Sequence, residues 1–357
     1  MNPDSVPRLK DVAAAANVSV AAASRILRGD TDPFSQGTSD RVVREAKRLG
    51  WRRNLLVNGL QTGKTNTIGV LVPPYDSFWV NVINGIHEEL ANRDYLPITV
   101  WIGDHDQFPY FEDSNEKGVE LINRLLDRRV DGLIMWPQFA VSFRQFFIEK
   151  VKKSVHVAVV DDHTPDAIGH TVLNNEIGAT QQVVDLLVSF GHRNIACLSE
   201  PNDCAHTWAQ VRTSSFVGAL EAKIGKAPNV EYVSARDPGA LFVATRLLTM
   251  EPLPTAVFAV TDHHAELIYH AAAKLGKRIP EDLSVIGFGN LKESSMFSPK
   301  LTTVDQDPRG LGRKAVELVL GQADNLKAKP TYQRTLVDAK LLQRESVSMI
   351  NPETNSS

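Results

Sequence analysis

The chain has 357 residues and a net charge of −3, with 43% hydrophobic and 23% charged residues. This length exceeds what one hydrophobic core usually organises, so two or three domains are expected. The composition is typical of a soluble globular protein, and no apolar run is long enough to span a membrane. The N-terminus does not resemble a secretory signal, so a cytoplasmic protein without a membrane partner is expected.

The small net charge conceals a basic N-terminal segment. Residues 1–64 hold eleven Lys and Arg against six Asp and Glu, whereas the rest of the chain is acidic. A small basic segment on an acidic body indicates that the segment meets a polyanion such as DNA. A solvated tail is the alternative, and the helical patterning of the segment disfavours it.

Three helices are predicted in this basic segment. Apolar residues recur at helical spacing in residues 9–16, in 19–28 and from about 35 to 49. Asn17 tolerates a left-handed turn after the first helix, and Ser19 is a good N-cap for the second. Two short helices joined by a tight turn form a helix-turn-helix, a motif that binds DNA.

The outer face of the second helix carries the candidate DNA contacts. Small alanines let the two helices pack closely and let the second helix approach a base-pair edge. Ser24, Arg25 and Arg28 supply contacts to bases or phosphates. An ordinary charged surface helix is the alternative interpretation. The predicted DNA-binding residues of this helix are Ser19, Val20, Ala21, Ser24, Arg25 and Arg28.

From residue 66 onward, strands and helices alternate. Parallel sheets with helices on both faces are expected from this alternation, and two successive runs indicate two lobes. Open sheets of this class bind ligands at the carboxyl ends of their strands. Buried strands are predicted at 67–73, 97–103, 130–136, 155–161, 194–200, 229–235, 255–261 and 283–289. The predicted fold class is an all-α helix-turn-helix head followed by an α/β body of two doubly wound parallel-sheet lobes.

These motifs resemble the lactose-repressor (LacI) family of bacterial regulators. The resemblance lies in "LKDVAAAANVSVAAASRILRG" and "SQGTSDRVVREAKRLGW" of the head and in "VDGLIM" and "IPEDLSVIGFGN" of the body. Ala22-Ala23 and Arg28 depart from the usual residues of the family. The resemblance implies a DNA-binding head at 1–50, a hinge at 51–65, and a periplasmic-binding-protein-like domain at 66–357 that binds an effector and dimerises.

The resemblance also implies that the chain crosses between the lobes three times. The crossings are expected near residues 162–164, 290–292 and 323–326. The expected lobes are therefore about 66–162 with 292–323, and about 164–290 with 326–345.

In the hinge, the resemblance implies two further DNA-binding residues. Asn54 would cap a short helix that forms on DNA, and Leu60 would enter the minor groove at the centre of the site and kink the duplex. A flexible linker with an incidental leucine is the alternative.

The effector residues also follow from the resemblance, position by position. Aromatic faces cover the apolar faces of a sugar ring, while carboxylates, arginine and amides bind its hydroxyl groups. Packing is an equal alternative for Trp101, and Asp262 could instead cap a helix. The predicted effector-binding residues are Phe78, Trp79, Trp101, Trp136, Asp161, Trp208, Arg212, Asp262 and Gln306.

The leading hypothesis is that the protein is a transcriptional regulator that acts as a repressor. It would bind double-stranded operator DNA as a homodimer under the control of a small effector, a sugar or glycoside. A sugar-binding protein without a DNA role is the alternative, although it leaves the basic head unexplained. An enzyme is not expected, because no nucleophile–base pattern is visible. No cofactor or metal is expected either, since neither the histidines nor the two cysteines show metal-ligand spacing.

Overall fold

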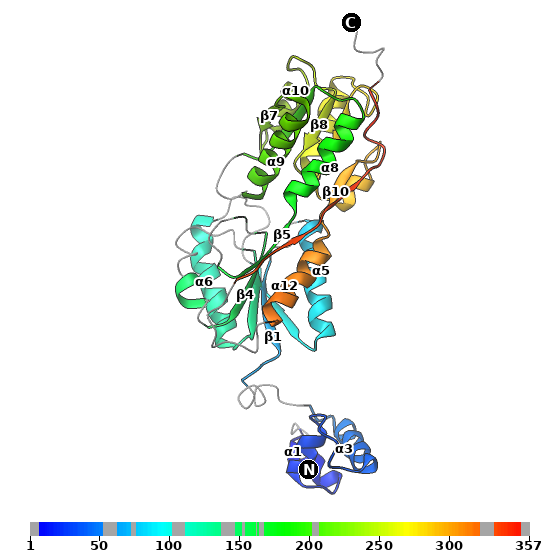
Figure 1. Ribbon diagram of the computed structural model, residues 1–357. Coiled ribbons are helices and arrows are strands. Elements are labelled where there is room, and N and C mark those ends of the chain that lie inside the picture. The colour runs from blue at the N-terminus through cyan, green and yellow to red at the C-terminus, as the bar shows by residue number, and fades with distance from the viewer. Residues whose placement is uncertain are drawn as a thin grey trace. The chain divides into compact units, whose positions relative to one another are not determined.

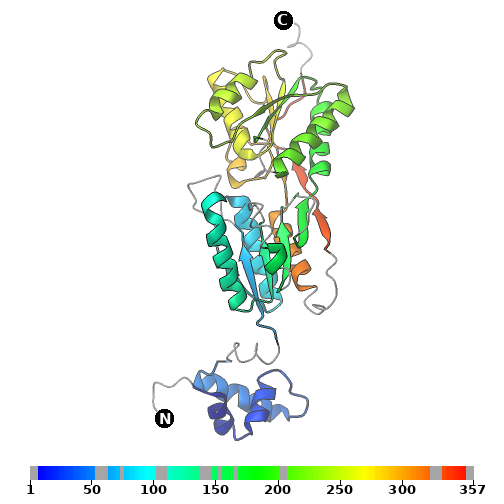
Figure 2. The same cartoon turned by 90° about the vertical axis from the view of Figure 1, so that its left-hand side faces the viewer.

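The chain separates into two compact units, Met1–Thr65 and Asn66–Ser357. Figures 1 and 2 show this computed structural model in two views. The structure describes residues 7–52, 63–72, 76–101, 111–136, 147–151, 154–161, 163, 168–201, 207–321 and 332–350. The predicted hinge residues Asn54 and Leu60 lie outside these ranges.

The first unit holds the three predicted helices, which confirms the helix-turn-helix. They are α1 (Leu9–Ala15), α2 (Val20–Ile26) and α3 (Gln36–Leu49). Asn17 adopts the left-handed conformation in the turn, with φ of 51°. Ser19 Oγ accepts a hydrogen bond of 3.1 Å from the Ala22 amide and so caps α2. The helices enclose a small core of Val12, Ala13, Ala16, Ala23, Ile26, Val42 and Ala46.

The first lobe of the second unit is a six-stranded parallel sheet in the order β11-β5-β4-β3-β1-β2. The strands are β1 (Thr67–Leu71), β2 (Leu96–Thr99), β3 (Gly132–Met135), β4 (His156–Val160), β5 (His170–Asn174) and β11 (Arg334–Val337). The helices are α5 (Ser77–Asn92), α6 (Phe111–Asp127) and α12 (Pro308–Leu320), with a π-helical turn at Phe147–Val151.

Alternate side chains of these strands fill two cores, one on each face of the sheet. Val70 and Ile134 pack with residues of α5 and α12, whereas their neighbours Leu71 and Leu133 pack with Leu125 of α6. Successive strand residues point to opposite faces, so strands that are apolar at every position bury both. Figure 1 shows α5 and α12 on one side of this sheet and α6 on the other.

The second lobe is a four-stranded parallel sheet in the order β7-β6-β8-β9. Helices α8 and α9 pack on one face, while α10 and α11 pack on the other. The strands are β6 (Ile195–Ser199), β7 (Asn229–Tyr232), β8 (Ala256–Ala259) and β9 (Ser284–Ile286). The helices are α8 (Glu176–Ser189), α9 (Thr207–Ile224), α10 (Ala240–Leu247), α11 (Asp262–Lys274) and a 3-10 turn at Lys292–Ser295. A short antiparallel pair, β10 (Thr303–Asp305) and β12 (Lys340–Leu342), adjoins this lobe.

The chain crosses between the lobes at three places that differ from the expected ones. Strand β5 still pairs with β4 of the first sheet, so the first crossing follows Asn174. Val304 of β10 lies in the core of the second lobe, whereas Leu311 of α12 lies in that of the first. The second crossing therefore lies between these two residues. The third lies between β11, which pairs with β5, and β12, which pairs with β10.

The expected crossings near 162–164, 290–292 and 323–326 are thus each too early in the chain. The reason is that β5 and β11 are short strands that pair with each other over a long sequence separation, a property without local periodicity. Similarly, the segment after residue 292 stays with the second lobe through the Ile286–Thr302 bridge.

No helix in the described part of the chain is long and apolar enough to cross a membrane.

Candidate functional site

The exposed face of α2 is the candidate DNA-binding surface. Val20, Ala21, Arg25 and Arg28 are exposed, and Ser24 is half-buried between them. Ala23 and Ile26 on the other face are buried in the core of the unit. Because three of the exposed positions are Ala, Ser or Val, the backbone of α2 can approach a base edge closely, and the arginines can reach past it.

Three local contacts position the arginines of this surface. Arg25 Nε donates to Asp30 Oδ2 at 2.8 Å, and its guanidinium lies 5.7 Å from the ring centre of Phe34. Arg28 Nη2 donates to Ser24 Oγ at 3.0 Å. The Arg25–Asp30 pair is about half exposed on both sides, so solvent and salt weaken it and DNA can compete for the arginine.

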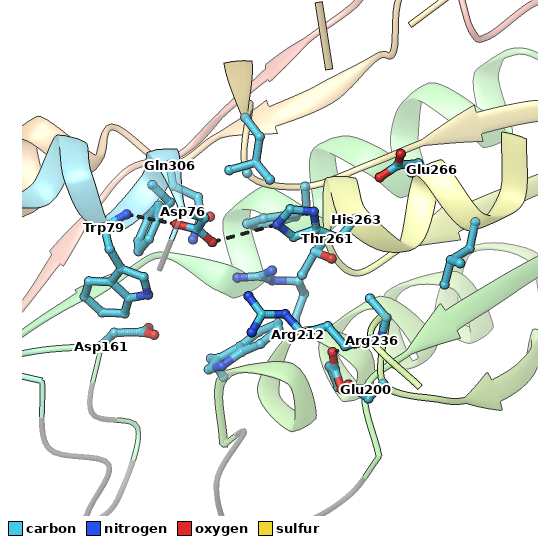
Figure 3. A pocket seen from close by; sticks show the side chains of 18 of the residues that line it. Asp76, Trp79, Asp161, Glu200, Arg212, Arg236, Thr261, His263, Glu266 and Gln306 are labelled. Carbon is cyan, nitrogen blue, oxygen red and sulfur yellow. Dashed lines mark hydrogen bonds and ion pairs between the residues drawn. The ribbon is translucent and has the colours of Figure 1, made fainter. Parts of the chain in front are cut away.

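The second unit contains a cavity of about 440 Å³ whose lining comes from both lobes. Residues of the first lobe lie at the ends of its strands and at the start of α5, and those of the second lobe lie at the ends of β6–β9 and on α9 and α11. This is where open parallel sheets bind ligands, at the carboxyl ends of the strands. Figure 3 shows these side chains converging on the cavity from several elements.

The first-lobe wall is aromatic. Phe78 and Trp79 at the start of α5 form an edge-to-face pair with ring centres 5.0 Å apart. Trp136, directly after β3, lies 5.0 Å from Trp79. All three rings are largely buried and line the cavity. Such a wall offers wide flat faces to an apolar ring surface.

Arg212 forms part of the second-lobe wall and is held on three sides. Its Nε and Nη2 each donate to a carboxylate oxygen of Glu176 at 2.8 Å, and its Nη1 donates to the Val260 carbonyl at 2.6 Å. Its guanidinium carbon lies 3.6 Å from the ring centre of Phe288 and 4.8 Å from that of Trp208. A bidentate carboxylate and two aromatic faces fix the guanidinium in one orientation.

Asp161 supplies a carboxylate at the end of β4. Its backbone is left-handed, with φ of 63°, and its Oδ1 lies 3.1 Å from His163 Nε2. Burial by itself lowers the pKa of His163, but the hydrogen bond to Asp161 and the charges of Asp161 and Glu176 raise this pKa above its ordinary value. The contact with His163 therefore orients the Asp161 side chain in the cavity wall.

A contact between the lobes borders the cavity. Asp76 caps α5 by accepting a 3.1 Å hydrogen bond from the Trp79 amide, and its other carboxylate oxygen lies 4.0 Å from His263 Nε2 at the start of α11. Figure 3 shows Asp76 joined by dashed lines to Trp79 of its own lobe and to His263 of the second lobe. An ionic contact at the rim can form only when the lobes approach each other.

The comparisons with known proteins identify the family. Residues 8–54 match the family model of bacterial regulatory proteins of the lacI family, and residues 184–347 match that of a periplasmic binding protein-like domain. Catabolite control protein A of Priestia megaterium is 30% identical over 319 residues, which are 87% of this chain and 90% of that protein. The chain belongs to the lacI family.

Two further relatives agree with this membership. The HTH-type transcriptional repressor CytR of Escherichia coli K12 is 29% identical over 88% of this chain and 89% of CytR. A crystal structure of the lac repressor dimer bound to operator and the anti-inducer ONPF shares the fold, with a TM-score of 0.76 and 22% identity. The match covers 96% of this chain and all of the other. As a lacI-family protein, the chain is a DNA-binding regulator with an effector-binding domain and not an enzyme.

The structure brings seven of the nine predicted effector residues to the cavity of this lacI-family protein. They are Phe78, Trp79, Trp136, Asp161, Trp208, Arg212 and Gln306.

Trp101 and Asp262 do not line this cavity. Trp101, which follows β2, is 63% exposed and is not among the residues that line the cavity. Asp262 is 2% exposed, and its carboxylate accepts hydrogen bonds from the Leu291 amide at 2.8 Å and from Thr303 Oγ1 at 2.5 Å. The prediction that they contact the effector finds no support here, because one side chain faces outward and the other is taken up by structural partners.

The sequence analysis missed several lining residues. Asp76 directly precedes α5, and Thr261 directly precedes α11, so a systematic reading of helix N-caps would have found both. Glu200 and Phe288 follow the ends of β6 and β9, where lining residues are expected on a parallel sheet. Within the described part of the chain, no group of three or more His, Cys, Asp or Glu side chains could hold a metal ion.

Proposed function

We propose that this lacI-family protein is a repressor that binds a pseudo-palindromic operator as a homodimer and changes its operator affinity when a sugar or glycoside occupies the cavity. The observation that carries the proposal is the composition of the cavity. One ligand there would touch Trp79 of the first lobe and Arg212 of the second at once. A ligand that contacts both lobes favours one lobe arrangement by its differential affinity for the two.

The chemistry of the lining supports a sugar. Phe78, Trp79 and Trp136 offer aromatic faces for the C–H surface of a pyranose ring. Asp161 can accept from hydroxyl groups, and Gln306 adds an amide. A volume of about 440 Å³ lies in the range of small-molecule sites.

On the DNA side, the proposal places α2 in the major groove. A dimer would present two such helices to successive major grooves, one in each half of the operator. Residues 51–65 would form the hinge, with Asn54 as a cap and Leu60 as the minor-groove wedge. The relative solved as a dimer on its operator with a bound anti-inducer supports this arrangement.

The test begins by selecting preferred duplexes from a random pool with the full-length protein. The selected duplex is then titrated with and without each member of a sugar panel, chosen by thermal stabilisation of the protein. We expect a two-fold symmetric site and a change of affinity of about 1–3 kcal/mol with the active sugar.

Trp79→Ala is the informative variant in this titration. It removes a stacking face, so it should weaken the sugar response and leave sugar-free operator binding near wild type. The proposal is wrong if no duplex is preferred, or if a stabilising sugar leaves operator affinity unchanged. Mass measurement of the protein on its site reports whether two copies bind.

A further inference from the structure

The charge that Arg212 would offer to a ligand is already neutralised by Glu176. Two of its nitrogens bind the two oxygens of that carboxylate at 2.8 Å, and the side chains are 4% and 1% exposed. An arginine recognises a carboxylate or phosphate best through such a paired edge. In this cavity, the edge formed by Nε and Nη2 is already bound by Glu176 of α8. Glu176 does not itself line the cavity.

Among the lining residues that the structure describes, the remaining charges are predominantly negative. The carboxylates Asp76, Asp161, Glu200 and Glu266 stand against the two arginines Arg212 and Arg236. The lining histidines His263 and His270 each face a carboxylate of the lining, 4.0 Å from Asp76 and 3.8 Å from Glu266, and so offer an anionic ligand no unpaired positive charge. His163 likewise faces Asp161 and Glu176.

From these contacts we infer that the cavity selects a neutral or cationic effector and rejects an anionic one, and that Glu176 is the specificity-determining residue for this choice. The inference rests on the proposed function and narrows its effector class. An incoming phosphate or carboxylate would lose its water without gaining the paired edge of Arg212, in a field of like charge. Hydroxyl groups carry no such penalty, and the outer Nη hydrogens of Arg212 can still donate to them.

The cavity tryptophans provide a test that needs no knowledge of the effector. Trp79, Trp136 and Trp208 line the cavity, and replacing Trp51 and Trp101 by Phe in the full chain leaves only these three of the five tryptophans. Their fluorescence is quenched with iodide, caesium ion and neutral acrylamide at constant ionic strength. Each quenching constant is divided by that of free N-acetyltryptophanamide.

We expect caesium ion to quench at least about threefold better than iodide on this normalised scale, because the local potential enriches cations. Glu176→Gln should raise iodide quenching by about two- to threefold, since one buried negative charge is removed. Asp185→Asn is the matched control, because Asp185 lies on the same helix but is exposed and paired with Lys223. Asp185→Asn should change neither the iodide nor the caesium quenching constant.

The inference is overturned if iodide quenches the parent protein as well as caesium ion does. This parent measurement decides the matter even if Glu176→Gln fails to fold. If Glu176→Gln folds but alters iodide quenching no more than Asp185→Asn, Glu176 does not set the selection.

A second experiment, with added ligands, distinguishes failure of this inference from failure of the proposed function. Thermal stabilisation is measured with neutral sugars and with their uronate and 6-phosphate counterparts. Stabilisation by the neutral members alone is expected. A phosphate or uronate that stabilises more than its neutral parent overturns the charge selection but leaves sugar control intact. If no sugar of any charge stabilises the protein, the sugar effector of the proposed function fails, and the quenching result still decides the charge preference.

Discussion

The side-chain amides of Asn174 and Gln306 join two of the three crossings between the lobes. Asn174 Nδ2 donates to the Gln306 carbonyl at 2.7 Å, and Gln306 Nε2 donates to Asn174 Oδ1 at 2.9 Å. Both residues are buried, and Gln306 also lines the cavity. An effector that engages the Gln306 amide therefore acts directly on a link between the strands about which the lobes would move.

Replacing Asn174 by Ala should destabilise the second unit by about 1–3 kcal/mol, because the buried amide and carbonyl of Gln306 lose their partners. Urea unfolding measures the change. Gln181→Ala is the control, since Gln181 is an exposed residue of α8 that binds only Asp185. Equal stability of the two variants would show that the Asn174–Gln306 pair adds nothing.

Arg25→Ala should reduce operator affinity by about 1–3 kcal/mol and relax the preference at one base pair of each half-site. Titrations against the selected operator and its single-base variants measure both effects. Uniform weakening on every sequence would instead make Arg25 a phosphate contact. Asp30→Asn releases Arg25 from its ion pair and should not weaken operator binding.

The stabilisation by His163 should depend on pH. Its pKa is raised in the folded state, so the stabilisation is fully present below the unfolded pKa of about 6.5 and disappears as pH rises through the higher folded value. The difference in unfolding free energy between wild type and His163→Gln should therefore shrink as the pH rises above about 6.5. A difference that stays constant or grows with pH contradicts the assigned ion pair.

Gly85→Ala should cost far more stability than Gly218→Ala. A Cβ at Gly85 of α5 would lie 2.2 Å from the carbonyl oxygen of Arg309 at the start of α12, whereas one at Gly218 of α9 meets nothing within 4 Å. Alanine in the open position should stabilise its helix by up to about 1 kcal/mol. Thermal unfolding of both variants checks the prediction, and similar melting temperatures would mean that α5 and α12 are not in close contact.

Asp262→Ala should act on stability and not selectively on the effector. The carboxylate holds the Leu291 amide and Thr303 Oγ1, and removing it leaves both buried groups unsatisfied at a cost of about 2–5 kcal/mol. Chemical unfolding and a sugar titration are compared on the same variant. Wild-type stability combined with a lost sugar response would restore Asp262 to the ligand site.

Local features of the sequence were sufficient for the head. Asn17 in the turn, Ser19 as a cap and Gly50 after α3 act on their immediate neighbours, so residue type and spacing predict them. The same holds for strands that are continuously apolar, such as β3 and β8, because burial on both faces leaves a readable pattern.

Only the tertiary structure decided which strand-end residues face the cavity. Asp161 and Asp262 both follow a buried strand, yet one lines the cavity and the other is enclosed by residues 291 and 303. The difference lies in which distant groups fold against each carboxylate.

The sequence also did not predict which residue pairs with Arg212, nor where the chain crosses between the lobes. Glu176 lies 36 positions before Arg212, and Gln306 lies 132 positions after Asn174. Such pairs follow from the packing of whole elements, whereas the sequence pattern records only whether a residue is buried and which neighbours it has along the chain. Spacing therefore predicted the fold class and the helix-turn-helix, and the family resemblance predicted most of the residues that line the cavity, whereas packing over long sequence separations determined which charged groups surround Arg212.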